Sequence, residues 1–404
     1  MVARSIDRGR LASSAILAVL GTRGPTSRAD LARTLDLSSA GITQLTKALI
    51  GRGLIAELDT SPSRGGRPGR LLGLVRSAGS AVGVKITADH VGVVQVGLNG
   101  SLSAARRHDF DPARPDALDH LAHLLKADIG QMEGHLLGIG VGVPGAVDAQ
   151  DSGVVSAPTL GWGDAQVGPM LRARLGLPVL VENDVNTLAV ADRLYGAGRQ
   201  YSNYMVVTIG RGIGCGVVVD GSVFRGAFGG AGEIGHLPVE YFGGQLCGCG
   251  SLGCLEAYVG DDALVRTAVA AKLLEDGQGI ADLVARARSG DAAAAGIFHQ
   301  AARILGAALS GVVHTLDPEV IILSGEGIDA WPFWESGFEE TFRSHLMPRW
   351  RSTPFLVQAW DESKWLLGAA CLVLATPFDT VGIGGDQGRM VRDRLQHNGS
   401  RVPA

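Results

Sequence analysis

Short apolar segments broken by glycine recur along the chain from residue 81 onward, and they constrain its fold more than any other feature. The clearest of these segments are residues 81–84, 91–96 and 137–143, followed by residues 204–209, 215–219 and 320–323. Their length and composition predict buried strands, and the helical stretches between the later ones indicate an α/β fold. Because the strands fall into an earlier and a later set, the sequence predicts two α/β lobes with a cleft between them.

The first 76 residues differ in charge from the rest of the chain. They hold 12 Lys and Arg residues against 5 Asp and Glu residues, a net charge of about +7. Since the whole chain has a formal charge of −4, the remaining residues carry about −11. A basic segment on an otherwise acidic protein favours binding to a polyanion.

The same N-terminal segment has the apolar spacing of a small helical domain. A first helix is expected to end at the turn of residues 21–25. Ser27 and Asp30 resemble a capping box at the start of a second helix. A third helix then runs to about Ile50, with apolar residues on one face and polar residues on the other. Three short helices in this order are typical of a helix-turn-helix domain.

Two further features of this segment point to DNA. Residues 54–58 and 71–75 predict the paired strands of a wing, joined by a glycine-rich, charged tip. Side chains suited to phosphates, base edges or a minor groove are Ser39, Thr43, Gln44 and Lys47 on the third helix, and Arg64, Arg67 and Arg70 in the wing. The wing alone could equally be a solvated hairpin. Together with the helices and the charge, it favours a DNA-binding winged helix-turn-helix.

One histidine and three cysteines form a second local pattern. His236 lies upstream of Cys247, Cys249 and Cys254 in a glycine-rich stretch. One imidazole and three thiolates are a closed tetrahedral ligand set for structural zinc. The alternatives are buried thiols or a redox pair, but the close spacing favours zinc. The other two cysteines, at positions 215 and 371, lie in apolar runs and are expected to be inert core residues.

Several carboxylates surround this pattern. Glu233 precedes His236 by three residues and Glu256 follows Cys254 by two, while the segment 182–184 adds a Glu-Asn-Asp run. Carboxylates and amides that converge in a cleft are suited to sugar hydroxyls, although each residue could equally be a surface group. The segment 208–216 is a strand that enters a glycine-rich turn, which serves either as a phosphate loop or as a plain hairpin.

Together these segments resemble the ROK family of repressors, open reading frames and sugar kinases, over about residues 10–375. The motifs that carry the resemblance lie at residues 182–186, 232–236 and 247–256. The resemblance implies an actin- or hexokinase-like, ribonuclease H-like domain of two lobes, with zinc held by the histidine and three cysteines. It also implies a sugar held by Asn183, Asp184, Glu233, His236 and Glu256, where Asp184 matches the general base of the family kinases.

The sequence departs from the kinases of the family at the first phosphate loop. Those kinases resemble Asp-x-Gly-Gly-Thr-Lys after the first strand, whereas this chain has Lys-Ile-Thr-Ala-Asp-His at residues 85–90. Lys85 replaces the aspartate that helps position Mg²⁺, side chains replace both glycines, and Asp89 would repel a phosphate. We therefore expect no ATP use and no catalysis. The alternatives are an ATP-dependent, glucokinase-like sugar kinase and a scaffold sequestered by a transport component.

The expected protein is a cytoplasmic repressor of the xylose or N-acetylglucosamine type. It would bind operator DNA as a homodimer or homotetramer and respond to a sugar, with no membrane partner. The expected domains are a winged helix-turn-helix at 1–76, a first lobe at 77–195, and a second lobe at 196–360 with the zinc loop and the oligomerisation surface. Residues 361–404 would form a buried helix on the first lobe and then a weakly structured polar tail.

Overall fold

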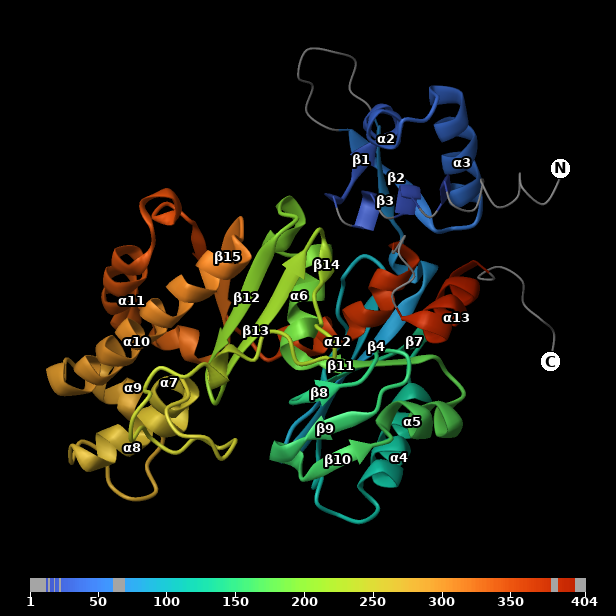
Figure 1. Cartoon of the computed structure of the whole chain (residues 1–404). Helices are drawn as coiled ribbons and strands as arrows, with labels where there is room; N and C mark the ends of the chain where they lie inside the picture. Colours follow the sequence, from blue (N-terminus) through green and yellow to red (C-terminus); the bar gives the residue numbers. More distant parts are fainter. Residues whose placement is uncertain are drawn as a thin grey trace. The chain divides into compact units, whose positions relative to one another are not determined.

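The computed structural model describes residues 12–60 (except 14, 18 and 22), 70–378 and 384–396, and it divides the chain into two compact units (Figure 1). The first unit contains residues 1–199 and 363–404, and the second contains residues 200–362. The chain therefore leaves the first unit after Arg199 and returns to it at Ser363. Arg64 and Arg67 lie outside the described residues.

The N-terminal part of the first unit is a helical domain with a small antiparallel sheet. The described residues between 12 and 23 are helical. The elements that follow are β1 (Thr26–Ser27), α2 (Arg28–Leu35), α3 (Ser39–Gly51), β2 (Ile55–Thr60) and β3 (Arg70–Leu74), with the strands in the order β1-β3-β2. The side-chain oxygen of Ser27 accepts from the backbone N–H of Asp30, which confirms the predicted start of α2.

The rest of the first unit is built on a mixed five-stranded sheet in the order β11-β7-β4-β5-β6. Its strands are β4 (Ser80–Ile86), β5 (His90–Gly97), β6 (Arg106–Asp109), β7 (Leu136–Val143) and β11 (Val179–Asn183). A second sheet contains β8 (Ala146–Val147), β9 (Val155–Ala157) and β10 (Trp162–Ala165). The short 3₁₀ helices are η1 (Arg76–Ala78), η2 (Pro158–Leu160), η3 (Ala197–Gln200) and η7 (Thr376–Phe378).

Helices cover both faces of the five-stranded sheet. In β4, β5, β7 and β11, residues that point to opposite faces belong to different apolar clusters, as the period of two in a strand requires. One face packs against α4 (Ala117–Ile129) and α5 (Val167–Leu175). The other face packs against α12 (Ser363–Ala375), which also lies along α6 (Asp184–Leu194). The buried helix predicted from residue 365 is therefore confirmed as α12.

Glycines in the sheet allow α12 to approach the strands closely. A Cβ atom added to Gly140 on β7 would lie 1.8 Å from the backbone oxygen of Ala369. On β4, a Cβ added to Gly83 would lie 2.1 Å from the backbone oxygen of Leu366. No side chain fits at either position, so the helix backbone rests directly on the sheet.

The second unit has its own five-stranded sheet, in the order β14-β13-β12-β15-β16. The strands are β12 (Tyr204–Ile209), β13 (Ile213–Val219), β14 (Ser222–Val223), β15 (Val320–Ser324) and β16 (Phe355–Val357). The helices are α7 (Glu256–Val259), α8 (Asp261–Ala270), α9 (Ile280–Arg288), α10 (Ala292–Leu316) and α11 (Trp331–His345), with the 3₁₀ turns η4 (Ile234–His236), η5 (Glu326–Ala330) and η6 (Pro348–Trp350).

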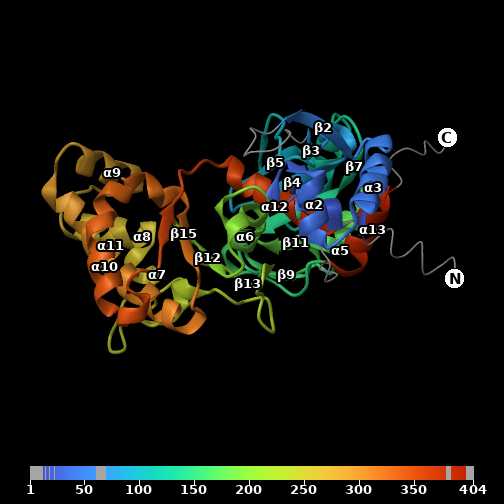
Figure 2. The same cartoon turned by 90° about the horizontal axis from the view of Figure 1, so that it is seen from above.

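Helix α10 is the longest element of the second unit. Among the described residues it is the one helix long and apolar enough to cross a membrane by length and composition, a test that core helices of soluble proteins also pass. It lies beside α11 in both views of the chain (Figures 1 and 2). Its Phe298, Leu305 and Leu309 belong to the buried core of the unit. This packing is that of a core helix.

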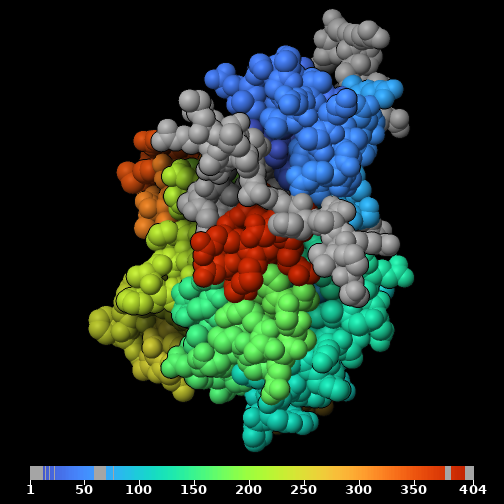
Figure 3. Space-filling model, turned by 90° about the vertical axis from the view of Figure 1, so that its right-hand side faces the viewer, coloured from blue at the N-terminus to red at the C-terminus, as the bar shows by residue number. Residues whose placement is uncertain are grey.

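The C-terminal segment differs from the sequence prediction. Residues 385–396, expected to be a weakly structured tail, form the helix α13 (Gly385–Gln396). Val391 and Leu395 are buried, and the Arg394 guanidinium donates to the backbone oxygen of Leu136 at 2.7 Å. Figure 3 shows this red segment seated against the green and teal surface of the same unit. This segment has too few apolar residues for its sequence to predict a helix. The helix is stabilised instead by its packing against the rest of the unit.

We predict that Gly140→Ala destabilises the first unit by about 1–3 kcal/mol, because the added methyl group cannot fit against the backbone of α12. Gly163→Ala is the matched control, since nothing lies within 4 Å of a Cβ at that position. Thermal unfolding of both variants should show a lower transition temperature for Gly140→Ala alone. Equal transition temperatures would contradict the close packing of α12.

Candidate functional site

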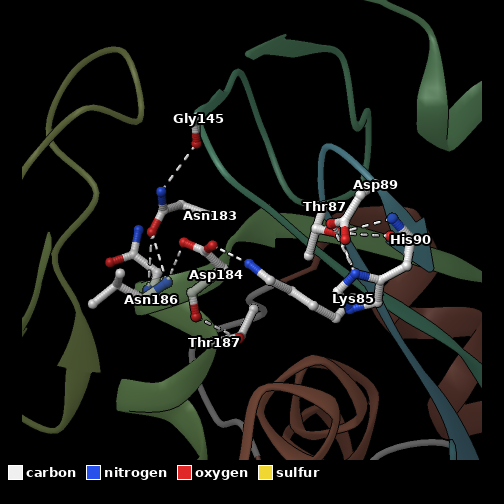
Figure 4. A network of polar contacts seen from close by, with 10 residues as sticks. Lys85, Thr87, Asp89, His90, Gly145, Asn183, Asp184, Asn186 and Thr187 are labelled. Carbon is white, nitrogen blue, oxygen red and sulfur yellow. Dashed lines mark hydrogen bonds and ion pairs between the residues drawn. The ribbon is translucent and has the colours of Figure 1, made fainter. Parts of the chain in front are cut away.

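A buried ion pair lies where β4 ends and α6 begins. The Nζ atom of Lys85 contacts the Oδ2 atom of Asp184, and the two side chains are only 10% and 12% exposed. Figure 4 shows the Lys85 side chain reaching from its strand toward the Asp184 carboxylate. The other carboxylate oxygen, Oδ1, accepts from the backbone N–H of Val185 at 2.9 Å. Both oxygens of Asp184 therefore have a donor from the protein.

Lys85 has a second partner on α12. Its Nζ atom lies 4.4 Å from the centroid of the Trp365 ring. A cation over an indole face is attracted by the negative charge density of the ring. Lys85 thus connects three elements, namely its own strand, the first residue of α6 and the first turn of α12. Sequence analysis identified Lys85 because it replaces an aspartate of the family kinases. It could not predict that Lys85 contacts Asp184 and Trp365.

The neighbours of Asp184 hold the start of α6 in place. The Asn183 side chain accepts from the backbone N–H groups of Val185 and Asn186, and it donates to the oxygen of Gly145 at 3.1 Å. Asn183 is therefore the N-cap of α6. Glu182 is completely buried and accepts from Gln150 at 2.9 Å. This network holds the backbone at the start of α6, where Asp184 is the first residue.

The loop after β4 carries Asp89 on the surface. Its carboxylate, 64% exposed, contacts the ring of His90 at 2.9 Å and the guanidinium of Arg107 at 3.4 Å. The hydrogen bond with His90, followed by one from Thr87, lowers the pKa of Asp89. Asp89 therefore carries its negative charge at neutral pH, on the loop where kinases of the resembled family bind phosphate.

In the second unit, the four predicted metal ligands come together. The Nδ1 or Nε2 atom of His236 and the sulfurs of Cys247, Cys249 and Cys254 lie within 4.8 Å of one another. Cys249 and Cys254 sulfurs are 3.8 Å apart, and His236 Nδ1 is 3.6 Å from the Cys247 sulfur. Tetrahedral zinc, with bonds of about 2.3 Å to sulfur and 2.0 Å to nitrogen, requires about 3.8 Å between two sulfurs and about 3.5 Å between a sulfur and a nitrogen. The geometry therefore fits a structural zinc site.

Two carboxylates of the second unit lie near these ligands in sequence. Glu233 is exposed and directly precedes the turn η4, which contains His236. Glu256 begins α7, and its Oε2 atom accepts from the backbone N–H of Ile213 at 3.2 Å. A Cβ on Gly235 would lie 3.4 Å from the same Oε2 atom. The structure thus brings Glu256 beside the residue that precedes His236.

The glycine-rich turn between β12 and β13 is lined by carboxylates. A Cβ added to Gly210 would lie 2.6 Å from Oε2 of Glu326, and the backbone N–H of Asp261 donates to the oxygen of Gly210 at 3.0 Å. Burial, then the negative charge of Glu326, raises the pKa of Asp261 to about 6. Sequence analysis missed both residues. The available signal was a glutamate between Gly325 and Gly327.

Four predicted DNA contacts share the exposed face of α3. Ser39, Thr43, Gln44 and Lys47 are all exposed, whereas Ile42 and Leu49 of the same helix are buried. Arg70 is also exposed, and its guanidinium pairs with Glu57 across the wing strands at 2.6 Å. The helix therefore presents a polar surface, while Arg70 is held by a carboxylate partner.

The two cysteines outside the metal cluster are buried in apolar cores. Cys215 is 5% exposed and Cys371 is fully buried. Burial raises the pKa of the Cys215 thiol to about 12, and that of Cys371 well above its ordinary value. A thiol that keeps its proton is a weak nucleophile and a poor metal ligand. The prediction of inert core cysteines agrees with this burial.

We predict that the purified protein contains about one zinc ion per chain. Cys249→Ser should lose most of this zinc because it removes one thiolate of a closed set of four. Elemental analysis after dialysis provides the measurement, and Cys371→Ala serves as the control because that thiol lies outside the cluster. Retention of zinc by Cys249→Ser would argue against the assigned ligands.

We also predict a pH-dependent effect of Asp261→Asn. Because the folded pKa of about 6 lies above the ordinary value of 3.8, the native protein holds the proton more tightly, and its stability falls as the pH rises from about 4 to 6. The variant removes this penalty and should be more stable above pH 6 by on the order of 2 kcal/mol. Urea unfolding at pH 4 and pH 8 tests this difference, which should vanish at pH 4.

Comparisons with known proteins agree with this architecture. The chain is 26% identical over 362 residues to the xylose repressor of Bacillus spizizenii, an alignment that covers 88% of this chain and 93% of that protein. The crystal structure of a ROK family transcriptional regulator, a homologue of the Escherichia coli MLC protein, has a TM-score of 0.80 at 25% identity. That match covers 96% of this chain and 99% of the regulator.

A kinase of known structure matches less of the chain. The ROK family glucokinase from Streptomyces griseus, in complex with glucose and AMPPNP, has a TM-score of 0.64 at 29% identity and covers 72% of this chain and 98% of the kinase. The family model described as "ROK family" matches residues 81–376, which is most of the chain. The protein therefore belongs to the ROK family.

Proposed function

We propose that this protein is a sugar-responsive transcriptional repressor whose kinase-like part has no catalytic activity. The observation that carries the proposal is the helical domain with its three-stranded sheet, because it presents the exposed polar face of α3 ahead of the part shared with kinases. The similarity of a solved regulator to 96% of the chain, against 72% for a glucokinase, supports the same conclusion.

The DNA contacts follow from the winged helix-turn-helix. In our proposal α3 enters the major groove, where Ser39, Thr43, Gln44 and Lys47 reach phosphates and base edges. Arg64, Arg67 and Arg70 would reach a minor groove, where an arginine meets concentrated negative potential. Arg70 would then exchange Glu57 for phosphate or base oxygens. Two copies in a homodimer or homotetramer would read a pseudo-palindromic operator in the cytoplasm.

The effector in our proposal is a sugar. As the family resemblance implies, we assign its hydroxyls to Asn183, Asp184, Glu233, His236 and Glu256. Zinc bound through Nδ1 of His236 would leave Nε2–H free to donate to a sugar oxygen. The metal would brace the turn that carries Glu233 and His236, so its part in sugar binding is structural.

Phosphoryl transfer is disfavoured at two places. A general base needs a carboxylate oxygen that is open to the substrate hydroxyl, whereas Oδ2 of Asp184 is held by Lys85. Glu326 and Asp261 place negative charge beside the second glycine-rich turn, where the phosphates of a nucleotide would be repelled. Both arrangements support a sensor without ATP.

The response is a difference in affinity between two arrangements of the same protein. A sugar that binds one conformation of the protein more tightly shifts the population toward that conformation, by no more than its difference in affinity. If that arrangement changes the spacing of the two DNA-binding domains, operator affinity falls when the sugar binds. The alternative function is an ATP-dependent sugar kinase, favoured by the glycines retained at 210, 212, 214 and 216.

We predict no ATP-dependent phosphorylation of any monosaccharide in a panel, and a DNA gel shift that one of the sugars weakens. Asp184→Ala should keep DNA binding but lose most of the sugar response, because it removes an acceptor for a sugar hydroxyl. Asp119→Ala is the control, since that exposed carboxylate pairs with Arg174 at the surface. Phosphorylation of any sugar would support the kinase instead, and a full response by Asp184→Ala would contradict the assigned site.

A further inference from the structure

We propose that Lys85 is a positioning residue of the effector site, in which its ammonium holds Asp184 until a sugar hydroxyl takes its place. When the sugar displaces Lys85 from Asp184, the ammonium also loses its contact with Trp365. Sugar binding therefore changes the surroundings of Trp365 at the start of α12. This proposal rests on the proposed function, because it describes how the same site signals that it is occupied. It adds a role for a residue that replaces a metal-positioning aspartate of the family kinases.

The competition follows from the donors around Asp184. An ammonium and a sugar hydroxyl both donate hydrogen bonds to a carboxylate. Oδ1 already accepts from the backbone N–H of Val185, and Oδ2 is held by Lys85. Since the two side chains are only 10% and 12% exposed, a third donor has little space while the pair stays intact. A hydroxyl that binds Asp184 therefore takes the position of the ammonium.

A displaced ammonium cannot remain where it is. An unpaired charge in a buried site is strongly disfavoured, so Lys85 must turn toward solvent or a new acceptor. The 4.4 Å contact between its Nζ atom and the Trp365 ring depends on the same side-chain position. Loss of the ion pair is thus accompanied by loss of the cation–π contact, and Trp365 becomes an internal reporter of the site.

The two helices that Lys85 contacts, α6 and α12, lie on either side of the second unit in the sequence. Helix α6 starts at Asp184 and leads toward the crossing after Arg199, whereas α12 starts at Ser363, directly after the return crossing. The two helices pack along each other. A change at Lys85 therefore acts on the first turns of both helices. The first turn of α12 lies where the chain returns to the first unit, whereas the crossing after Arg199 follows the far end of α6 at Leu194.

The test uses tryptophan fluorescence of the full chain. The sequence contains six tryptophans, so spectra are recorded in parallel for Trp365→Phe, and the difference isolates the emission of Trp365. Lys85→Met removes the ammonium, Lys85→Arg keeps a cation, and Lys364→Met is a control on the neighbouring lysine of α12. The probes are D-xylose, D-glucose and N-acetyl-D-glucosamine, and their binding is measured separately by calorimetry.

Without a probe, Lys85→Met should change the emission of Trp365, whereas Lys364→Met should not. A probe that binds should shift the wild-type emission of Trp365 toward that of Lys85→Met. This shift should be lost in Lys85→Met and recovered in part in Lys85→Arg. If Lys85→Met does not fold, Lys85→Gln replaces it, because it keeps a polar side chain without the charge.

Two results would overturn the proposal. One is identical Trp365 emission in the wild type and Lys85→Met without a probe. The other is a probe that binds and leaves Trp365 emission unchanged, which would show that Lys85 stays in place. If such a probe also weakens DNA binding, the proposed function stands while the role of Lys85 fails. A panel in which no sugar affects DNA binding would contradict the proposed function, and the probe-free comparison would still decide the Lys85 contact.

Discussion

The first unit depends on the direct contact between α12 and the sheet beneath it. Gly83 and Gly140 allow the helix backbone to lie where side chains would otherwise stand, so residues 283 and 229 positions apart in sequence pack together. This contact brings Trp365 over Lys85 and aligns α12 with α6. Without it, the buried ammonium would lose one partner and the start of α6 would lose its support.

The buried charges of this protein are compensated in different ways, and the differences explain their roles. Lys85 and Asp184 neutralise each other, so their burial is tolerated as long as they stay together. Asp261 is buried beside acidic neighbours, and burial, followed by the negative charge of Glu326, raises the pKa of its carboxyl. The metal ligands form a closed set in which each thiolate would be compensated by a cation. A pair that must break for a ligand to bind is the arrangement best suited to a sensor.

Sequence reasoning was most successful where chemistry is local. The four metal ligands, the N-cap at Ser27 and the strands of both lobes follow from residue type and spacing, because each depends on residues that lie close in sequence, at most 18 positions apart for the metal ligands. It failed for α13, whose helix is stabilised by packing that no local pattern reveals. It also missed Glu326 and Asp261, since their proximity to Gly210 depends on the packing of three separate segments.

The sequence by itself determined that the chain is a basic N-terminal head followed by α/β lobes with a metal-ligating cluster, and that Lys85 replaces a kinase aspartate. Residue types and short spacings suffice for such conclusions. Only the tertiary structure decided that Lys85 contacts both Asp184 and Trp365, because these residues lie 99 and 280 positions away in sequence. Contacts over such separations are set by the packing of whole helices and strands. The effect of a lysine at position 85 therefore depends on the partners that this packing places around it.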